Sequence, residues 1–211
     1  MTIALRQSRL KSSPVPAAET PVRLPVRRFS LEEYHRLIEI GFFADDERVE
    51  LIEGILVPMS PMHSKQAAAI RRLDREFGRQ LSDLALVSVQ MPISLPRTTT
   101  EPEPDLALAR LREDDYSQAH PDPEDLYLVV EVAYSSLAND EGTKAELYAR
   151  SGIQEYWIFN LIDELLVVYR NPFTSAGGVG SYQTKITLHR DDIASPLAFP
   201  DCKIRVREIL P

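Results

Sequence analysis

Leu126-Tyr-Leu-Val-Val-Glu-Val-Ala133 is the stretch of this 211-residue sequence that decides the fold. A nearly continuous apolar run of this length is typical of a strand at the centre of a sheet, covered on both faces. Glu131 interrupts the run, and its carboxylate must be neutral, paired or bound to a cation, because burying an unpaired charge is costly. The stretch therefore predicts a central strand that carries either a structural ion pair or a functional acid.

Helices and further strands are predicted on both sides of this strand. Before it, a helix is predicted that Ser60, Pro61 and Ser64 introduce and whose apolar spacing runs through Leu81; after it, a helix is predicted from Asp140 to Ser151, ended by Gly152. Other strands are expected over residues 84–95, 106–108, 155–160 and 165–169, with loops over 97–104, 110–125 and 171–181 and short strands and turns over 182–210. This order predicts an α/β fold in which helices flank a mixed β-sheet.

The region before the first long helix is expected to hold two small elements. Ser30 and Glu33 have the spacing of a capping box, which predicts a short helix through Ile40. Residues 49–57 have the pattern of a β-hairpin that turns near Gly54. The fold is therefore expected to carry an N-terminal β-hairpin in front of its sheet.

Composition and charge narrow the class of protein. Hydrophobic residues make up 44% and charged residues 27% of the sequence, which is usual for a globular domain. The single cysteine, Cys202, excludes a disulfide framework. No apolar stretch is long enough for a membrane helix and none resembles a signal peptide, so we expect no membrane partner and a cytoplasmic location.

Charge is distributed unevenly along the chain. Residues 1–28 contain six basic residues, one acidic residue and four prolines, which predicts a mobile basic arm. Residues 29–211, expected as a single domain, hold the other 18 basic and 31 acidic residues. A body this acidic is unlike a general nucleic-acid binder, but it is compatible with a carboxylate cluster that holds a divalent cation.

Asp105 and Lys144 are the residues that join Glu131 as candidates for chemistry. Pro102 and Pro104 hold the backbone before Asp105 extended, and carboxylates from neighbouring strands can share Mg²⁺. Lys144 either pairs with Asp140 on the helix surface or points back to the acids, where it would orient water and stabilise a transition state. Taken alone, a Pro-Asp turn and a surface ion pair remain the alternatives.

Three segments resemble the Uma2 family of bacterial proteins classed as endonucleases. They are residues 49–61, residues 101–108, and residues 129–137 with their continuation through 158, so that the likeness covers about residues 29–170. The family is similar to PD-(D/E)xK nucleases. The resemblance therefore implies a restriction-endonuclease-like core, in which a mixed sheet is flanked by helices.

The resemblance also implies roles for individual residues. Asp105 and Glu131 would hold Mg²⁺ (or Mn²⁺) together with the Val132 carbonyl, and Glu50 would be a further acid. The general nuclease pattern places a lysine where this chain has Ala133, and in this family the lysine is displaced to the following helix, which matches Lys144. Two positions depart from the family, which usually has His at the place of Gln66 and commonly Asp or Ser at the place of Tyr134.

The implied function is that of a Mg²⁺-dependent phosphodiesterase, namely a DNA endonuclease. A basic rim beside its acids is expected from Arg71, Arg72, Arg75 and Arg79. The alternatives are a catalytically silent dimeric protein that binds nucleic acid or another partner, and a phosphodiesterase with a different substrate. Apolar residues of the strands over 155–160 and 165–169, namely Tyr156, Trp157 and Phe159 with residues 165–169, are expected near a sheet edge. With the resemblance, that edge predicts a homodimer.

Overall fold

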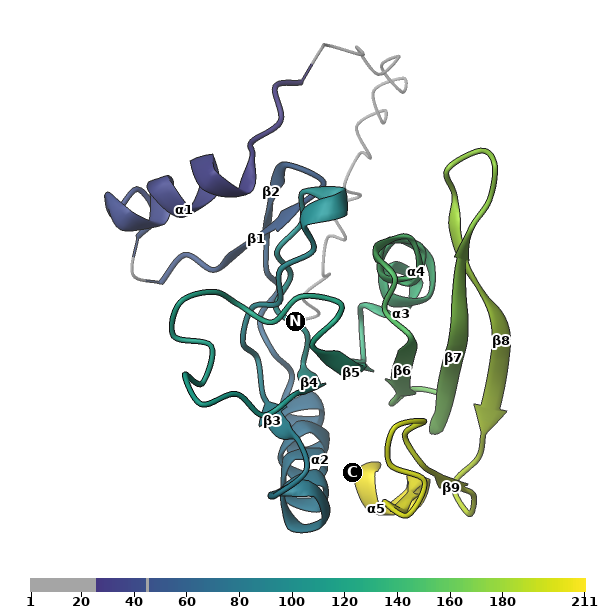
Figure 1. The fold of residues 1–211 in the computed structure, drawn as a ribbon. Helices are drawn as coiled ribbons and strands as arrows, with labels where there is room; N and C mark the ends of the chain where they lie inside the picture. Colours follow the sequence, from purple (N-terminus) through teal and green to yellow (C-terminus); the bar gives the residue numbers. More distant parts are fainter. Residues whose placement is uncertain (1–25, 45) are drawn as a thin grey trace, which may run out of the picture.

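A six-stranded mixed sheet lies between two layers of helices in the computed structural model, which describes residues 26–44 and 46–211 (Figure 1). The strands follow the order β3 (Leu86–Ser88), β4 (Leu106–Ala109), β5 (Leu126–Ala133), β6 (Glu155–Asn160), β7 (Leu165–Thr174) and β8 (Gly180–Leu188). Only β5 and β6 pair in parallel, and the other neighbours in this sheet are antiparallel. The predicted α/β fold and the central place of β5 are confirmed.

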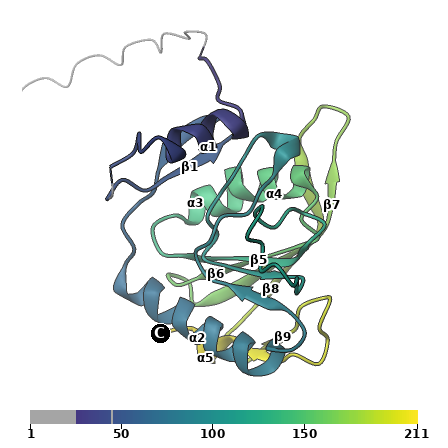
Figure 2. The same ribbon diagram turned by 60° about the vertical axis from the view of Figure 1, so that its left-hand side comes forward.

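The two faces of the sheet carry separate hydrophobic clusters. Helix α2 (Ser64–Leu81) and the short α5 (Val206–Ile209) cover one face, and α3 (Leu137–Asn139) and α4 (Ala145–Ser151) lie over the other (Figure 2). In β5, Val130 and Val132 pack into the cluster that contains α2, whereas Val129 and Ala133 pack into the cluster that contains α4. Side chains alternate along a strand, so Glu131 points toward the α4 layer.

The segment that crosses from β5 to β6 is not one regular helix over residues 140–151. A π-helical turn, η2 (Asp140–Lys144), joins α3 to α4. Such turns are frequent at functional sites because they change the direction in which side chains leave a helix. Gly152 ends α4 as predicted, with a φ of 90° that favours glycine.

The N-terminal elements agree with the prediction. Helix α1 (Leu31–Glu39) begins at the Ser30–Glu33 capping box. The hairpin of β1 (Val49–Ile52) and β2 (Ile55–Pro58) turns through Glu53 and Gly54, both with positive φ, which is the conformation that two-residue hairpin turns prefer. The Glu101 N–H donates to the Leu51 carbonyl at 2.7 Å, so the hairpin is fixed to the segment that leads into β4.

The predicted basic arm lies, up to residue 25, outside the described residues. Contacts with the hairpin begin within the last predicted arm residues: the Arg28 guanidinium donates to the Glu53 carbonyl, and the Phe29 N–H donates to the Gly54 carbonyl at 2.8 Å. A side chain at Gly54 would collide with this segment. Residues 28 and 29 therefore hold the hairpin turn.

Two predicted boundaries are wrong. The strand expected over residues 84–95 is reduced to β3, because Gln90 has a φ of 50° and Pro92 cannot donate to a ladder. The loop expected over 171–181 is instead the end of a hairpin, since β7 continues to Thr174 and β8 starts at Gly180. A short 3₁₀ turn, η1 (Pro96–Thr98), and a small ribbon of β9 (Ile193–Ala194) and β10 (Ile204–Arg205) complete the described elements.

The apolar sheet edge expected around β6 and β7 does not exist. Tyr156, Trp157 and Phe159 are fully buried, and β8 covers the outer side of β7. The difference has a simple cause: residues 182–210 are expected to form only short strands and turns, whereas residues 180–188 form the nine-residue strand β8, which pairs along β7. The edge strands of this sheet are β3 and β8.

Candidate active site

Asp105 directly precedes β4, and Glu131 lies on the neighbouring strand β5. Leu106 pairs with Val130 in the antiparallel ladder, and one further step of this register places Asp105 opposite Glu131. The Val132 N–H donates to Asp105 Oδ2 at 2.8 Å, and both carboxyl groups are buried, with 7% and 4% of the residue exposed.

Lys144 contacts Glu131 directly. Its Nζ donates to Glu131 Oε1 at 2.8 Å, whereas Asp140 Oδ1 lies 3.9 Å away. Only 14% of the lysine side chain is exposed, so the alternative of a solvated surface pair with Asp140 does not describe it. Burial alone would lower the pKa of Lys144, but the charges of Glu131, Glu50 and Asp140 raise it above its ordinary value, so the ammonium is charged.

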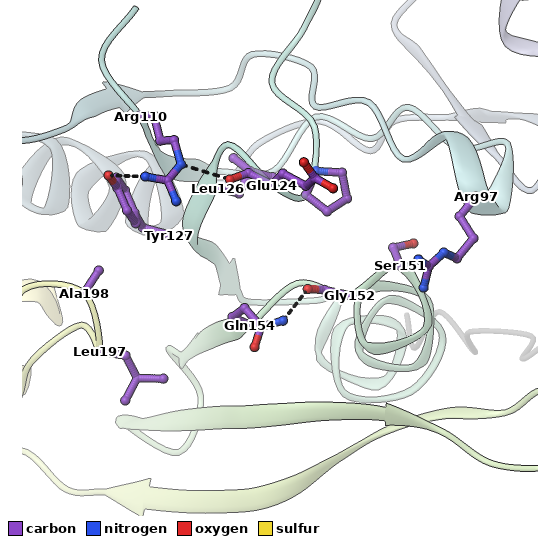
Figure 3. A pocket seen from close by; sticks show the side chains of 11 residues that line it. Arg97, Arg110, Glu124, Leu126, Tyr127, Ser151, Gly152, Gln154, Leu197 and Ala198 are labelled. Atoms are coloured by element: carbon purple, nitrogen blue, oxygen red, sulfur yellow. Dashed lines mark hydrogen bonds between the residues drawn. The ribbon is translucent and has the colours of Figure 1, made fainter.

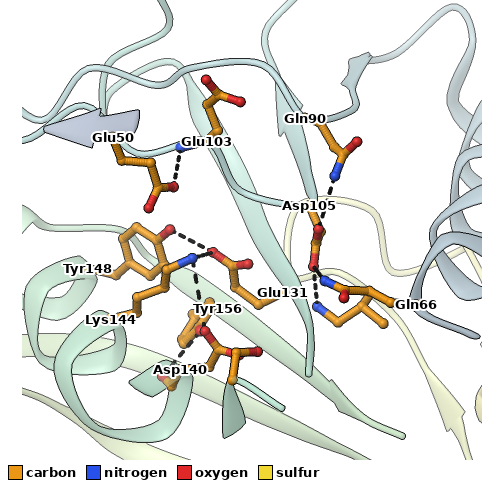
Figure 4. A network of polar contacts seen from close by, with 12 residues as sticks. Glu50, Gln66, Gln90, Glu103, Asp105, Glu131, Asp140, Lys144, Tyr148 and Tyr156 are labelled. Carbon is orange, nitrogen blue, oxygen red and sulfur yellow. Dashed lines mark hydrogen bonds and ion pairs between the residues drawn. The ribbon is translucent and has the colours of Figure 1, made fainter. Parts of the chain in front are cut away.

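Tyr148 is a member of the site that the sequence reasoning did not assign. It lies one helical turn after Lys144, on the same face, and its hydroxyl donates to Glu131 Oε1 at 2.9 Å. Burial and the nearby Glu131 raise the pKa of Tyr148 well above its ordinary value, so the hydroxyl keeps its proton. One oxygen of Glu131 is thus held by two donors (Figure 4).

Two further acids are buried around this pair. Glu50, on β1, accepts a hydrogen bond from the Glu103 N–H at 2.8 Å, and burial raises its pKa. Asp140 accepts from the Ser136 hydroxyl through Oδ2, but its Oδ1 is buried without a hydrogen-bond partner. Burial and, next, the charge of Glu131 raise the pKa of Asp140 to about 7 and that of Asp105 to about 6. The site therefore holds more negative charge than Lys144 can balance.

This arrangement fits a divalent cation. Within residues 26–44 and 46–211, no group of three His, Cys, Asp or Glu side chains is arranged to hold a metal ion by itself. Mg²⁺, however, commonly uses one or two carboxylates and completes its shell with waters and carbonyl oxygens. Because the Val132 N–H points to Asp105, the carbonyl of the same residue faces the same side of the strand. Asp105, Glu131 and this carbonyl are suitable ligands.

The acids and Lys144 line a cleft with a volume of 410 Å³ between the hairpin, the start of α2 and the β5–α4 connection. Gln66, which the family resemblance matches to a position usually held by His, donates to Asp105 Oδ2 at 3.2 Å, and Gln90 donates to Oδ1 at 3.4 Å (Figure 4). Tyr134 is not among the lining residues and stacks on His63, with ring centroids 4.3 Å apart. Of the two residues that differ from the family pattern, Gln66 therefore lies in the cleft, whereas Tyr134 lies outside its lining.

The arginines of α2 do not form the expected rim around the cleft. Gln66 is the α2 residue that lines the cleft, and α2 runs away from that end. Arg79 follows 13 residues later, which is about 20 Å along a helix, and Arg72 donates to the carbonyls of Ile209 and Leu210. The cationic side chains that line the cleft are Lys144 and Arg48.

A second cavity, with a volume of 540 Å³, lies at the other end of β5, near Leu126 (Figure 3). Arg110, which lines it, already donates to the Glu124 carbonyl and the Tyr127 hydroxyl. Its lining includes a single acid, Glu124, and no buried titratable group. Clustered buried acids with shifted pKa values mark the smaller cleft as the candidate active site.

Comparisons with known proteins agree with this fold. The crystal structure of a "putative nuclease" of the DUF820 family from Anabaena variabilis ATCC 29413 superposes with a TM-score of 0.67 at 14% identity, covering 86% of this chain and 97% of that one, which shows a shared fold. No curated protein has a matching sequence. None of the described helices is long and apolar enough to cross a membrane. The family model described as "Uma2: Putative restriction endonuclease" matches residues 31–207, so the chain belongs to the Uma2 family.

Proposed function

We propose that this protein is a Mg²⁺- or Mn²⁺-dependent phosphodiesterase that cleaves DNA internally at the Asp105–Glu131–Lys144 site. The observation that carries the proposal is the contact of a buried, charged lysine with one of two cross-strand acids at the floor of a cleft. The family to which the chain belongs is described as restriction endonucleases, and this supports a nuclease function. A bound divalent cation would supply positive charge to the phosphate and acidify water.

The chain's own residues divide the remaining tasks. Asp105 is oriented by the Val132 N–H and by the amide groups of Gln66 and Gln90. Tyr148 and Lys144 fix one oxygen of Glu131, which leaves its other oxygen turned toward Asp105 (Figure 4). These donors preorganise both carboxylates as cation ligands, so little reorganisation is required when substrate arrives.

Lys144 has a second task in this proposal. Its ammonium is held near the acids by Glu131 and Asp140, where it would orient the attacking water and stabilise the negative charge that develops on the phosphate oxygens. Glu50 would offer a further carboxylate to a water or a second cation from the hairpin side. Phosphodiester hydrolysis at this site therefore needs the acids for cation binding and the lysine for the reaction itself.

A homodimer remains part of the proposal through the family resemblance, since the sheet-edge argument for it no longer applies. Light scattering at tens of micromolar protein tests this point. A mass near twice the 23.9 kDa of the chain is expected, and a single species near 24 kDa would contradict it.

A catalytically silent protein of the same fold is the second candidate. It is favoured by the excess of acidic residues in the body and by Gln66, whose amide cannot titrate and already donates to Asp105. In that case the cleft would bind nucleic acid or another partner without cleaving it. The two candidates differ in one measurable property, which is strand cleavage.

Supercoiled plasmid, incubated with the purified protein in EDTA, Mg²⁺ or Mn²⁺, tests the proposal. We expect nicked or linear product only with a divalent cation, and loss of that product in Asp105→Asn and in Lys144→Met. Lys185→Met is the matched control, because Lys185 is half-exposed and pairs with Glu141 outside the cleft. Intact plasmid with wild-type protein, or equal cleavage by Asp105→Asn, would contradict the proposal.

A further inference from the structure

The candidate cleft presents an electrostatic difficulty for a polyanionic substrate. Its lining contains five acidic side chains, namely Glu50, Glu103, Asp105, Glu131 and Asp140, and two basic ones. Nucleic-acid binding depends mainly on basic side chains that contact phosphates. A divalent cation would offset part of this negative charge, but the entry of a phosphodiester still calls for a cationic side chain with donors directed to the opening.

Lys144 does not meet this requirement. Its ammonium is engaged by Glu131 Oε1 at 2.8 Å, and only 14% of its side chain is exposed. It therefore acts at the floor of the cleft and contributes little to the capture of substrate from solution.

Arg48 does meet it. This residue directly precedes β1, lines the cleft and has half of its side chain exposed. One guanidinium nitrogen, Nη2, pairs with Glu103 Oε2 at 2.6 Å. A guanidinium has five N–H donors in a fixed planar arrangement that suits two oxygens of one phosphate, and most of these donors remain for a ligand.

Glu103 gives Arg48 a defined position in the cleft wall. The Glu103 N–H donates to Glu50 Oε1, and Glu103 follows shortly after Glu101, whose backbone pairs with Leu51 of β1. Arg48, Glu50 and Glu103 thus form one connected group on the hairpin side, across the cleft from Lys144 (Figure 4 shows Glu50 and Glu103). The carboxylate of Glu103 orients the guanidinium and, being negative, also competes with a phosphate for it.

We propose that Arg48 is a substrate-binding residue that contacts a backbone phosphate of the nucleic acid, and that Glu103 orients Arg48 and weakens this contact. The inference rests on the proposed function, because it assumes a phosphodiester substrate in this cleft. The contact adds affinity and leaves the chemical step to the acids and Lys144.

The simpler reading is that Arg48 and Glu103 form a structural ion pair that fixes the hairpin. The two readings predict opposite signs for one pair of variants. If the pair is structural, removing either partner changes the affinity for DNA in the same direction. If Arg48 binds phosphate, Arg48→Ala weakens binding, whereas Glu103→Gln strengthens it by freeing the guanidinium and removing a negative charge.

Fluorescence anisotropy with a fluorescein-labelled 20-base-pair DNA duplex, in Mg²⁺, tests this directly. Asp105→Asn serves as the background, since no cleavage is expected there. We expect Arg48→Ala to weaken binding about tenfold and to lower the slope of log K against log salt by about 1, as for the loss of one phosphate contact. Arg48→Lys should keep the slope, and Glu103→Gln should tighten binding a few-fold. Arg190→Ala is the matched control, because Arg190 is half-exposed and pairs with Glu164 outside the cleft.

Equal affinity of Arg48→Ala and its background, or weakening by both Arg48→Ala and Glu103→Gln, would overturn the inference. So would the absence of measurable duplex binding. Melting temperatures of all variants show whether a loss of binding comes from a loss of folded protein. Wild-type plasmid cleavage with an unaffected Arg48→Ala variant would reject the role of Arg48 alone, whereas duplex binding that needs Arg48 without any cleavage would reject the proposed catalysis alone.

Discussion

Replacement of Lys144 by methionine tests whether this residue neutralises the buried acids. Glu131 is 4% exposed, and its Oε1 is held by Lys144 and Tyr148. In Lys144→Met, the side chain keeps most of its apolar volume but the positive charge is lost. The Glu131 carboxylate then keeps only the neutral hydroxyl of Tyr148 as a donor, and the acids Asp105 and Asp140 lie near it.

The expected loss is large compared with that of a surface ion pair. Removing one partner of a buried pair costs about 3–5 kcal/mol, because the remaining charge is uncompensated. For a chain of this length, about 3 kcal/mol corresponds to a fall of about 6–12 °C in melting temperature. Adding Glu131→Gln removes the orphaned charge, so the double variant should regain at least about 2 kcal/mol relative to Lys144→Met.

Urea unfolding at pH 8 in EDTA measures these free energies. Lys185→Met, which breaks the half-exposed pair with Glu141 at 3.2 Å, should change stability by about 0.5 kcal/mol or less. If Lys144→Met loses no more than this control, or if Glu131→Gln fails to compensate, the reasoning about the buried pair is refuted.

Three other predictions follow from the burial of titratable and small residues. Burial raises the pKa of Asp105 to about 6 and of Asp140 to about 7; folding thus favours their protonated forms, and stability is lost as pH rises from about 4 toward 7. In EDTA the melting temperature should fall between pH 5 and 8, and Asp140→Asn should reduce this fall; a flat profile in wild type would argue against it. Gly180→Ala should destabilise by about 1–3 kcal/mol in urea unfolding, because a Cβ there would lie 2.2 Å from the Glu146 carbonyl oxygen; unchanged stability would contradict this packing. Burial raises the pKa of Cys202 to about 11, so a thiol reagent at pH 8 should react slowly until the protein is unfolded, and rapid labelling of native protein would show that this thiol is accessible.

The sequence was informative where local chemistry and burial agree. An acid inside an apolar run identified the central strand and Glu131 together, and the two prolines before Asp105 indicated its extended backbone. The capping box at Ser30 and the turn at Gly54 depend on neighbouring residues alone, and both occur in the structure. The approach of Lys144 to the acids was one of two open alternatives, and the structure places its Nζ on Glu131.

Features that depend on long-range pairing were not predictable in the same way. The alternation over residues 182–188 predicts a short strand, but the start of β8 at Gly180 and its place in the main sheet depend on pairing with β7. The position of Asp140 depends on the π-helical turn, and no residue pattern in the sequence predicts that turn. Tyr148 has the apolar spacing of a core residue. Only the packing of α4 on β5 shows that its hydroxyl donates a hydrogen bond to Glu131.

Calorimetric titration of Mn²⁺ into wild-type protein, Glu131→Gln and the exposed control Glu164→Gln tests the central claim that Asp105 and Glu131 hold a divalent cation. Wild type and control are expected to bind with the same affinity. Glu131→Gln should lose this binding but remain folded, as its melting temperature in EDTA would show, because Lys144 keeps the charges of Asp140 and Glu50 near it. Unchanged Mn²⁺ affinity in a folded Glu131→Gln protein would contradict the account.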